Sequence, residues 1–151
     1  MATRIYPERY IEAAPERLRD ARRLQSNDRF VLGLYCAGVA AECVLRGFRT
    51  LDGAEFYEGH DMLDLLDGCD QLRLGSDRPR FHAALNTLRK IWQNDFRYHS
   101  HSLLQTRFFK RKMTRTFEGR RIKGDPVAFY CRLAIEQASV ILSIGERQWD
   151  T

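Results

Sequence analysis

Apolar side chains recur every three or four residues along most of this chain, with charged side chains between them. An α-helix presents one apolar face at that spacing, so the pattern predicts helices. The expected helices cover residues 7 to 24, 30 to 48, a short segment from 62, 81 to 92, and 126 to 147. Outside them no window alternates as a strand would, and no repeat appears. The sequence predicts an all-α bundle of four or five main helices, with residues 1–151 forming a single domain.

Turn and capping residues separate these segments. Pro15 lies inside the first pattern, where its missing N–H predicts a kink or a restart of the helix. Residues 25 to 28 are turn and N-cap residue types, and Asp61 is a candidate cap of the third helix. A loop is expected at 75 to 79. Residues 124 to 126, Gly-Asp-Pro, supply a stop, an N-cap and a first-turn proline for the last helix.

The second helix is the most apolar and is expected at the centre of the bundle. Its small residues predict close packing against neighbouring helices rather than a ligand loop, because they lie inside helical periodicity; they are Gly33, Ala37, Gly38, Ala40 and Ala41. Glu42 is the exception on this helix. It lies either on an exposed strip or against a buried partner, since burying a lone carboxylate is costly.

Composition places the chain among folded globular proteins. The 151 residues are 44% hydrophobic and 30% charged, which excludes disordered and collagen-like classes. The four cysteines have no CxxC spacing, and no apolar signal segment follows Met1. Charges interrupt the apolar runs before they reach the length of a membrane span. We therefore expect a soluble protein of the reducing cytoplasm that does not engage a membrane.

The net charge of +5 is unevenly distributed. Residues 107–123 carry eight Lys or Arg residues and one Glu, a net charge of +7, which leaves −2 for the remainder. Taken as a helix, this segment aligns Phe109, Met113 and Phe117 on one face. The cations that fan over the rest are Arg107, Lys110, Arg111, Lys112 and Arg115. Such a face attracts RNA phosphates. A solvated face docked through its phenylalanines and an anionic membrane surface are the alternatives.

A second candidate site lies just before this segment, on the expected polar link of residues 97 to 102. Cleavage of RNA by its own 2′-hydroxyl needs a base, an acid and a cation near the phosphate. Arg97, His99 and His101 supply those residue types. In the alternative interpretation, Arg97 pairs with a carboxylate such as Asp95 or Glu42, and the two histidines are solvated.

Three smaller features complete the candidate chemistry. His60 either hydrogen-bonds locally at a helix start or makes a second contact to phosphate. Asp61, Asp64 and Asp67 repeat every three residues, as a solvated acidic strip or a dock for a partner subunit's basic segment. Cys36 and Cys43 share a helix face, but the further ligands of a zinc site are not apparent. With no phosphate-loop or nucleophile motif either, we expect no metal and no cofactor.

The order of these motifs resembles the HEPN domain (higher eukaryotes and prokaryotes nucleotide-binding). The resemblance rests on Ala-Gly-Val-Ala-Ala-Glu-Cys-Val-Leu-Arg at 37–46, Gly-His-Asp-Met at 59–62, and Trp92 followed by Phe-Arg-Tyr at 96–98. It implies an antiparallel helical bundle that pairs into a homodimer and acts in bacterial toxin–antitoxin, phage-defence or RNA-processing systems. Catalytic members are metal-independent ribonucleases with four to six residues between an Arg and a His.

The chain departs from that catalytic pattern. Three residues separate Arg97 from His101 and one separates it from His99, so Arg97-Tyr98 looks like the family's Arg-Tyr class. We expect an RNA- or nucleotide-binding protein in which Arg97, His99 and His101 are the candidate catalytic residues. The expected binding residues are His60, Tyr98 and the cations of 107–115. The alternative is a non-catalytic module that binds a protein, such as a nucleotidyltransferase-like antitoxin.

Overall fold

The computed structural model describes residues 5–70 and 72–149, and six α-helices dominate this part of the chain. The helices are α1 (Pro7–Ser26), α2 (Phe30–Leu51), α3 (Met62–Leu66), α4 (Arg78–Ile91), α5 (His101–Lys110) and α6 (Pro126–Trp149). Two 3-10 helices, η1 (Gly75–Asp77) and η2 (Asn94–Tyr98), flank α4, and a hairpin of β1 (Thr116–Phe117) and β2 (Arg120–Arg121) precedes α6. The all-α expectation is confirmed apart from this hairpin, which the sequence pattern did not predict.

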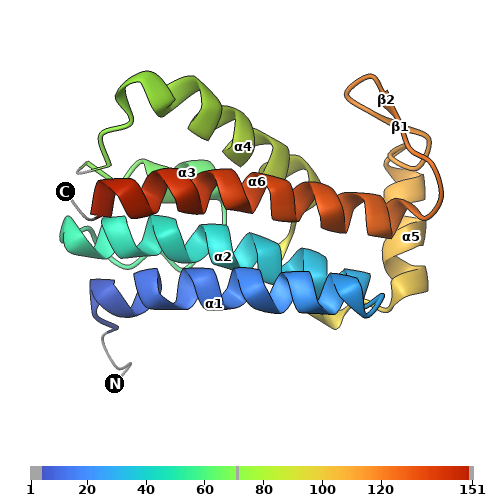
Figure 1. Ribbon diagram of the computed structural model, residues 1–151, viewed down its shortest axis with the longest axis horizontal. Helices are drawn as coiled ribbons and strands as arrows, with labels where there is room; N and C mark the ends of the chain where they lie inside the picture. The colour runs from blue at the N-terminus through green and yellow to red at the C-terminus, as the bar shows by residue number, and fades with distance from the viewer. Residues whose placement is uncertain (1–4, 71, 150–151) are drawn as a thin grey trace.

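Four helices form the bundle, with α2 and α6 at its centre. Figure 1 shows α1, α2 and α6 stacked along one direction, α4 inclined across α6, and α5 crossing one end. The chain runs antiparallel between α1 and α2 and between α4 and α6, but α2 and α6 run parallel (Figure 1). The expected antiparallel arrangement therefore holds for neighbours other than this central pair. Because α2 and α6 run parallel, the chain must cross from the end of α2 back to the end of the bundle where α2 begins before α6 can start. The segment from α3 to the hairpin makes this connection.

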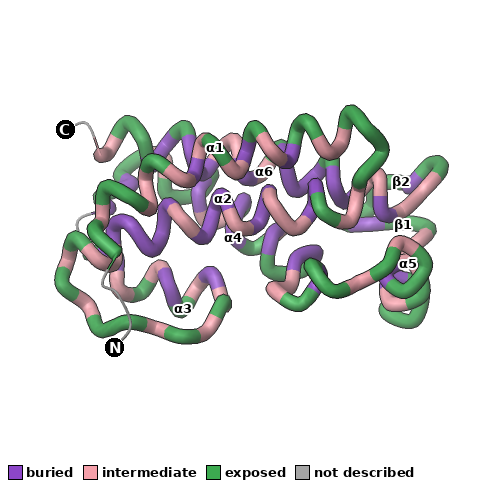
Figure 2. Tube along the Cα trace, turned by 90° about the horizontal axis from the view of Figure 1, so that it is seen from below, coloured by how far each residue is buried: buried purple, intermediate pink, exposed green. Residues whose placement is uncertain are grey.

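The small residues of α2 pack against more than one neighbouring segment, as the sequence predicted. A Cβ on Gly33 would lie 2.8 Å from Sγ of Cys131, and one on Gly38 would lie 2.1 Å from Nε1 of Trp92. The Trp92 ring fits against the bare backbone and donates to the carbonyl of Tyr35 at 3.1 Å. Figure 2 shows the buried positions gathered along the inward faces of α2, α4 and α6. The small residues thus set how closely α4 and α6 approach α2.

Two of the predicted helix caps are confirmed, whereas the break at Pro15 and the cap before α2 are not observed. Asp61 caps α3, accepting from the N–H groups of Leu63 and Asp64 at 3.0 and 3.2 Å. Asp125 caps α6, accepting from the N–H of Val127 at 2.9 Å. The α1 helix neither stops nor restarts at Pro15, because the packing of its apolar face against α2 compensates for one lost hydrogen bond. No side chain caps α2, so the N-cap role expected within 25 to 28 is wrong.

Two helices have the composition of a membrane span. Both α2 and α6 contain an eighteen-residue window with at most two charges, of mean hydropathy 1.5 and 1.4, and 56% of each window is buried in the bundle. The expectation that charges interrupt the apolar runs is corrected for these two helices. Core helices of soluble proteins have the same composition, because they are surrounded by other helices.

Candidate functional site

Arg97, the proposed phosphate clamp, lies in η2 rather than on an irregular polar link. Its NH1 donates to the hydroxyl of Tyr35 at 3.3 Å, and its Cζ lies 4.7 Å from the ring centroid of Tyr98. Tyr98 itself is 75% exposed. Neither Asp95 nor Glu42 pairs with Arg97, so that alternative is wrong: Asp95 pairs with Arg107, and Glu42 pairs within its own helix.

His99 uses both of its ring nitrogens within the chain. Nδ1 lies 3.0 Å from the carbonyl oxygen of Asp95, and Nε2 lies 2.9 Å from NH1 of Arg107. Since a guanidinium only donates, Nε2 accepts and Nδ1 carries the proton. Arg107 also bridges to the Asp95 carboxylate at 3.1 Å and to the side-chain oxygen of Gln93. His99 therefore connects η2 to α5 and has no ring nitrogen left for a substrate.

His101 is the first residue of α5, and its partner differs from those of Arg97 and His99. Its Nε2 lies 2.8 Å from Oδ2 of Asp125, the residue that caps α6. The pair joins the start of α5 to the start of α6. Arg97, His99 and His101 thus turn to three separate partners and do not converge on one site. The two histidines are not simply solvated linker residues either.

The basic segment is not one helix. α5 ends at Lys110, and Lys112 takes a left-handed backbone with φ of 58°. The N–H of Lys112 bonds to the carbonyl of Phe109 and that of Met113 bonds to Phe108, which is the Schellman arrangement that ends a helix. Phe109 is 69% exposed whereas Phe117 is 8% exposed. The expected shared face of Phe109, Met113 and Phe117 is therefore wrong.

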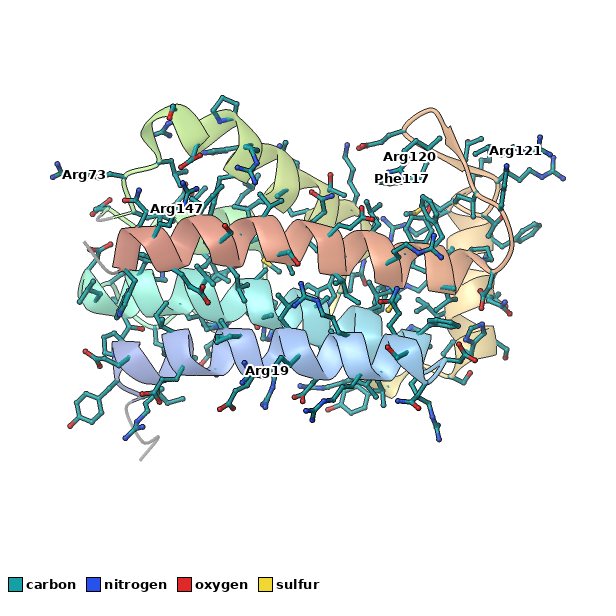
Figure 3. The ribbon with its side chains drawn as sticks, viewed as in Figure 1. Arg19, Arg73, Phe117, Arg120, Arg121 and Arg147 are labelled. Atoms are coloured by element: carbon teal, nitrogen blue, oxygen red, sulfur yellow. The ribbon has the colours of Figure 1, made fainter. Side chains whose placement is uncertain are left out.

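The hairpin replaces the rest of the expected helix. Glu118 and Gly119 at its turn have φ of 48° and 80°, values that a two-residue type I′ turn requires. Phe117 packs edge-on against Tyr130 of α6, and the Tyr130 hydroxyl donates to the carbonyl of Met113 at 2.6 Å. Arg121 projects away from the bundle (Figure 3). The hairpin therefore has an anchored apolar side and a solvent-facing cationic side.

The cations of residues 107–123 are largely free of intramolecular carboxylates. Among the described residues, Arg107 is the one cation of this segment that pairs with a carboxylate, that of Asp95. Glu118, the acidic residue of the segment, pairs with Lys90 of α4 at 2.7 Å. The exposed remainder comprises Lys110, Arg111, Lys112, Arg115, Arg120, Arg121 and Lys123. Positive charge on this scale concentrates polyanions at the surface.

A groove lies where this basic segment meets the ends of α3 and α4. It has a volume of about 460 Å³ and is lined by His60, Asp61, Met62, Asn86, Arg89, Lys90, Trp92, Gln93, Asn94 and Arg111. Lys90 links the groove to the hairpin through Glu118, and Arg111 NH2 donates to the carbonyl of Lys90 at 3.4 Å. The basic segment therefore borders a hollow whose lining includes three cations and three side-chain amides.

Burial raises the pKa of Asp61 in this groove, but hydrogen bonds oppose it and hold that pKa below its ordinary value. The lowering comes from Arg89, whose NH2 donates to Oδ2 at 3.0 Å, and from the two backbone N–H groups of α3. Asp61 stays ionised, capping α3 and fixing Arg89 beside the groove. Asp64 accepts from the Tyr57 hydroxyl at 3.0 Å. Two carboxylates of the expected acidic strip, Asp61 and Asp64, therefore already have hydrogen-bond partners within the chain.

His60 belongs to a cluster of three side chains, of which Glu42 and Arg46 are buried and His60 is partly exposed. Glu42 and Arg46 have side chains that are 9% and 10% exposed, and Oε1 of Glu42 accepts from NH2 of Arg46 at 3.2 Å. The same oxygen is in hydrogen-bond contact with Nδ1 of His60, whose side chain is 38% exposed. Of the two interpretations of Glu42, the buried partner is the correct one.

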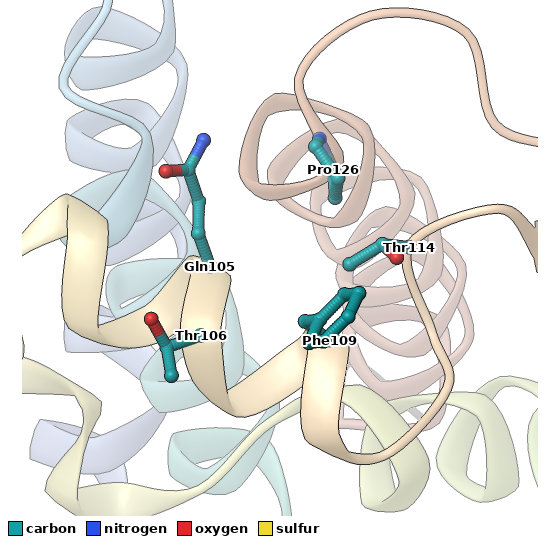
Figure 4. A pocket seen from close by; sticks show the side chains of 5 residues that line it. All are labelled: Gln105, Thr106, Phe109, Thr114 and Pro126. Atoms are coloured by element: carbon teal, nitrogen blue, oxygen red, sulfur yellow. The ribbon is translucent and has the colours of Figure 1, made fainter.

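Two other hollows are less suited to a charged ligand. One, of about 320 Å³, lies between α5 and the start of α6 and is lined by Gln105, Thr106, Phe109, Thr114 and Pro126 (Figure 4), without a charged side chain. The other, of about 480 Å³, lies between α1 and α6. Its cations include Arg22, which bonds to Ser139, and Arg147, which pairs with Asp77, and Glu146 also lines it.

The cysteines are packing residues with little thiolate character. Burial raises the pKa of Cys43 to about 11 and those of Cys69 and Cys131 to about 12. Within residues 5–70 and 72–149, no group of three His, Cys, Asp or Glu side chains is arranged to hold a metal ion.

Sequence reasoning identified His60 and Arg111 but missed most of the groove. Arg89 and Lys90 occupy the last turn of a strongly periodic helix, where cations are unremarkable. The link residues Gln93 and Asn94 carry no motif. Glu42 on an apolar helix was a signal for the cluster with Arg46 and His60, because a carboxylate there needs either water or a partner.

Searches of family models, of curated proteins and of solved structures found no match to this chain.

Proposed function

We propose that this chain is a HEPN-like helical protein of the cytoplasm that binds RNA or a nucleotide through phosphate groups. The observation that carries the proposal is the groove beside α3 and α4. Arg89, Lys90 and Arg111 reach it from two helix ends, together with three side-chain amides. Guanidinium and amide groups match phosphate oxygens in geometry and charge.

The basic hairpin extends this binding surface beyond a single phosphate. Its cations continue outward from Arg111 on the segment that Lys90 and Glu118 tie to the groove. A strand of RNA lying along both would release several counterions. A toxin, phage-defence or RNA-processing role and a homodimer belong to this proposal through the family resemblance.

The test is RNA binding measured by fluorescence anisotropy at several salt concentrations, with a labelled single-stranded RNA and with ATP as competitor. The groove variant carries Arg89→Gln, Lys90→Gln and Arg111→Gln. We expect its Kd to rise at least roughly tenfold, and the slope of log Kd against log salt to fall by about 2, since each lost phosphate contact removes about 0.7. Competition by ATP would assign the groove to a nucleotide.

The α1–α6 hollow provides a matched control. It is of similar volume and contains Arg19, Arg22 and Arg147 (Arg19 and Arg147 are labelled in Figure 3), so replacing all three by Gln removes the same charge. We expect a change in Kd below about twofold. Equal weakening by both triple variants, or no binding by the unaltered protein, contradicts the proposal.

A protein-binding module is the second candidate. Tyr98 is 75% exposed with Arg97 stacked on it, and exposed aromatic and arginine side chains are the usual anchors of protein interfaces. If RNA binding fails, capture of a nucleotidyltransferase-like protein that is lost with Tyr98→Ala would support this alternative.

A further inference from the structure

The hollow between α5 and the start of α6 has no part in the proposed binding of phosphates. Its volume is about 320 Å³, and its lining has no charged side chain. Figure 4 shows the ring of Phe109 beside Thr114, and Phe109 is 69% exposed. The hydroxyl of Thr106 is already satisfied, because it donates to the carbonyl of Ser102 at 3.0 Å. The hollow therefore suits one apolar side chain.

Exposed cations flank this hollow along the chain. Lys110 directly follows Phe109, and Arg115 directly follows Thr114. Both belong to residues 107–123, which have a net charge of +7. An apolar side chain within an acidic sequence would match both the hollow and its surroundings.

The chain itself contains such a sequence. Residues 52–70 carry seven Asp or Glu residues and no Lys or Arg, a net charge of −7. Phe56 lies within this acidic segment and is 71% exposed. Among the described residues, the side chains of its neighbours Glu55 and Glu58 take part in no ion pair. The acidic and basic segments thus have equal and opposite net charges.

The structure fixes the backbone that presents Phe56. NH1 of Arg46 donates to the carbonyl of Tyr57 and NH2 to the carbonyl of Gly59, both at 2.8 Å. The same guanidinium lies against the Phe56 ring, with Cζ 5.2 Å from the ring centroid. A side chain on a fixed backbone loses less conformational freedom when it binds.

Phe56 does not fill the hollow of its own chain. Its ring lies against Arg46, and the segment that carries it leaves α2 at the end of the bundle opposite to α5 (Figure 1). An occupant with this sequence therefore comes from a second copy. Because the two surfaces differ, each copy has one of each, and the contact can repeat from copy to copy.

We infer that Phe56 of one copy docks in the α5–α6 hollow of another, where Glu55 and Glu58 meet Lys110 and Arg115. This contact joins unlike surfaces, so it is separate from the two-fold homodimer that the family resemblance implies. It does not depend on the proposed binding of RNA. One aromatic anchor with exposed charge pairs makes a small contact, so the association is reversible and sensitive to salt.

The experiment is sedimentation equilibrium of the unaltered chain, without RNA, over a range of protein concentrations. We expect the average mass to rise with concentration past twice that of one chain. Raising NaCl from about 0.05 M to about 0.5 M should weaken the association, because salt screens exposed charge pairs. The mass of a single chain at every concentration overturns the inference.

Two variants each remove one of the surfaces. Phe56→Ala removes the anchor. Thr106→Glu puts a carboxylate at the edge of the hollow, at an exposed helical position that tolerates glutamate. Each should weaken self-association at least about tenfold, the usual effect of losing an anchor. Tyr6→Ala removes an aromatic side chain that is 68% exposed at the start of α1 and should change nothing.

Mixing the two variants tests the head-to-tail geometry. Phe56→Ala keeps an intact hollow and Thr106→Glu keeps an intact Phe56, so an equimolar mixture has one working pair of surfaces. We expect each variant alone to remain a single chain and the mixture to form a complex of two chains and no larger. A mixture that does not associate, or association that Phe56→Ala and Tyr6→Ala affect equally, overturns the inference. Growth that stops at a dimer in the unaltered protein also overturns it and favours a two-fold homodimer.

Discussion

Glu42 and Arg46 lie one turn apart on the most apolar helix of the protein, and each is less costly to bury because the other is there. The Glu42 carboxylate accepts hydrogen bonds from the Arg46 guanidinium and the His60 imidazole. The same guanidinium also donates to two loop carbonyls, those of Tyr57 and Gly59. Removing either member leaves a charge in a site that is nine-tenths buried. At this scale the cluster is a determinant of stability.

Glu42→Ala and Arg46→Ala should each lower the free energy of unfolding by about 3 to 5 kcal/mol, the usual cost of breaking a buried ion pair. The measurement is urea unfolding followed by circular dichroism. Arg9→Ala breaks the exposed pair of Arg9 with Glu12, three residues apart on α1, and should cost about 1 kcal/mol or less. Equal losses for the buried and exposed pairs would contradict the assignment.

Asp61→Asn keeps an oxygen that can cap α3 but removes the charge that pairs with Arg89. Because the pKa of Asp61 is lower in the folded protein than its ordinary 3.8, its contribution to stability is present above that value and is lost as the pH falls through the folded pKa. The variant should be less stable than the unaltered protein at pH 7, and the difference should shrink below about pH 4. Urea unfolding at both pH values measures it.

Arg89→Gln removes the same interaction from the other side. Its effect at pH 7 should not add to that of Asp61→Asn, because the two residues share one ion pair. Additive losses, or a difference that persists at low pH, would mean that Asp61 stabilises the protein through the cap alone.

At the scale of elements, the division of residues 101–123 into helix and hairpin depends on a single backbone reversal. Lys112 occupies the left-handed region with φ of 58°, a conformation that glycine adopts more easily than lysine. Contacts of Phe117 with Tyr130 then hold the hairpin against α6. The cost at Lys112 is offset by these contacts and by the two Schellman hydrogen bonds.

Lys112→Gly should raise the free energy of unfolding by up to about 1 kcal/mol, because glycine relieves the left-handed backbone. Lys110→Gly, at the last residue of α5, serves as the comparison. It removes the same charge from a right-handed position and should lower the free energy of unfolding. Thermal unfolding of both variants measures the difference, and destabilisation by Lys112→Gly would contradict the assigned backbone.

At the scale of the molecule, one continuous core connects all the helices. Buried residues of α1, α2, α3, α4, α5 and α6 and of the hairpin belong to one cluster. Trp92, at the end of α4, and Trp149, at the end of α6, both pack on this cluster from opposite parts of the bundle. The groove residues are attached to this core through the ends of α3, α4 and α5.

Unfolding should therefore be one cooperative transition. Tryptophan fluorescence and far-ultraviolet circular dichroism should give the same urea midpoint, because loss of any helix exposes the shared core. Hydrogen exchange of the hairpin amides should be faster than that of α2, since the two short strands have few backbone bonds. Two separated transitions would show that the α3–α5 connection folds apart from the bundle.

The sequence by itself determined α1, α2, α3, α4 and α6, because the spacing of apolar residues and the caps at Asp61 and Asp125 act within a few positions of the chain. It also indicated that Glu42 needs either water or a partner, and where positive charge accumulates. The tertiary structure alone decided that α2 and α6 run parallel and that residues 113–123 turn back as a hairpin. It likewise separated Arg97, His99 and His101 and brought His60, Arg89, Lys90 and Arg111 together. Those outcomes depend on contacts between residues far apart in the chain, and such contacts leave no local period or motif to read.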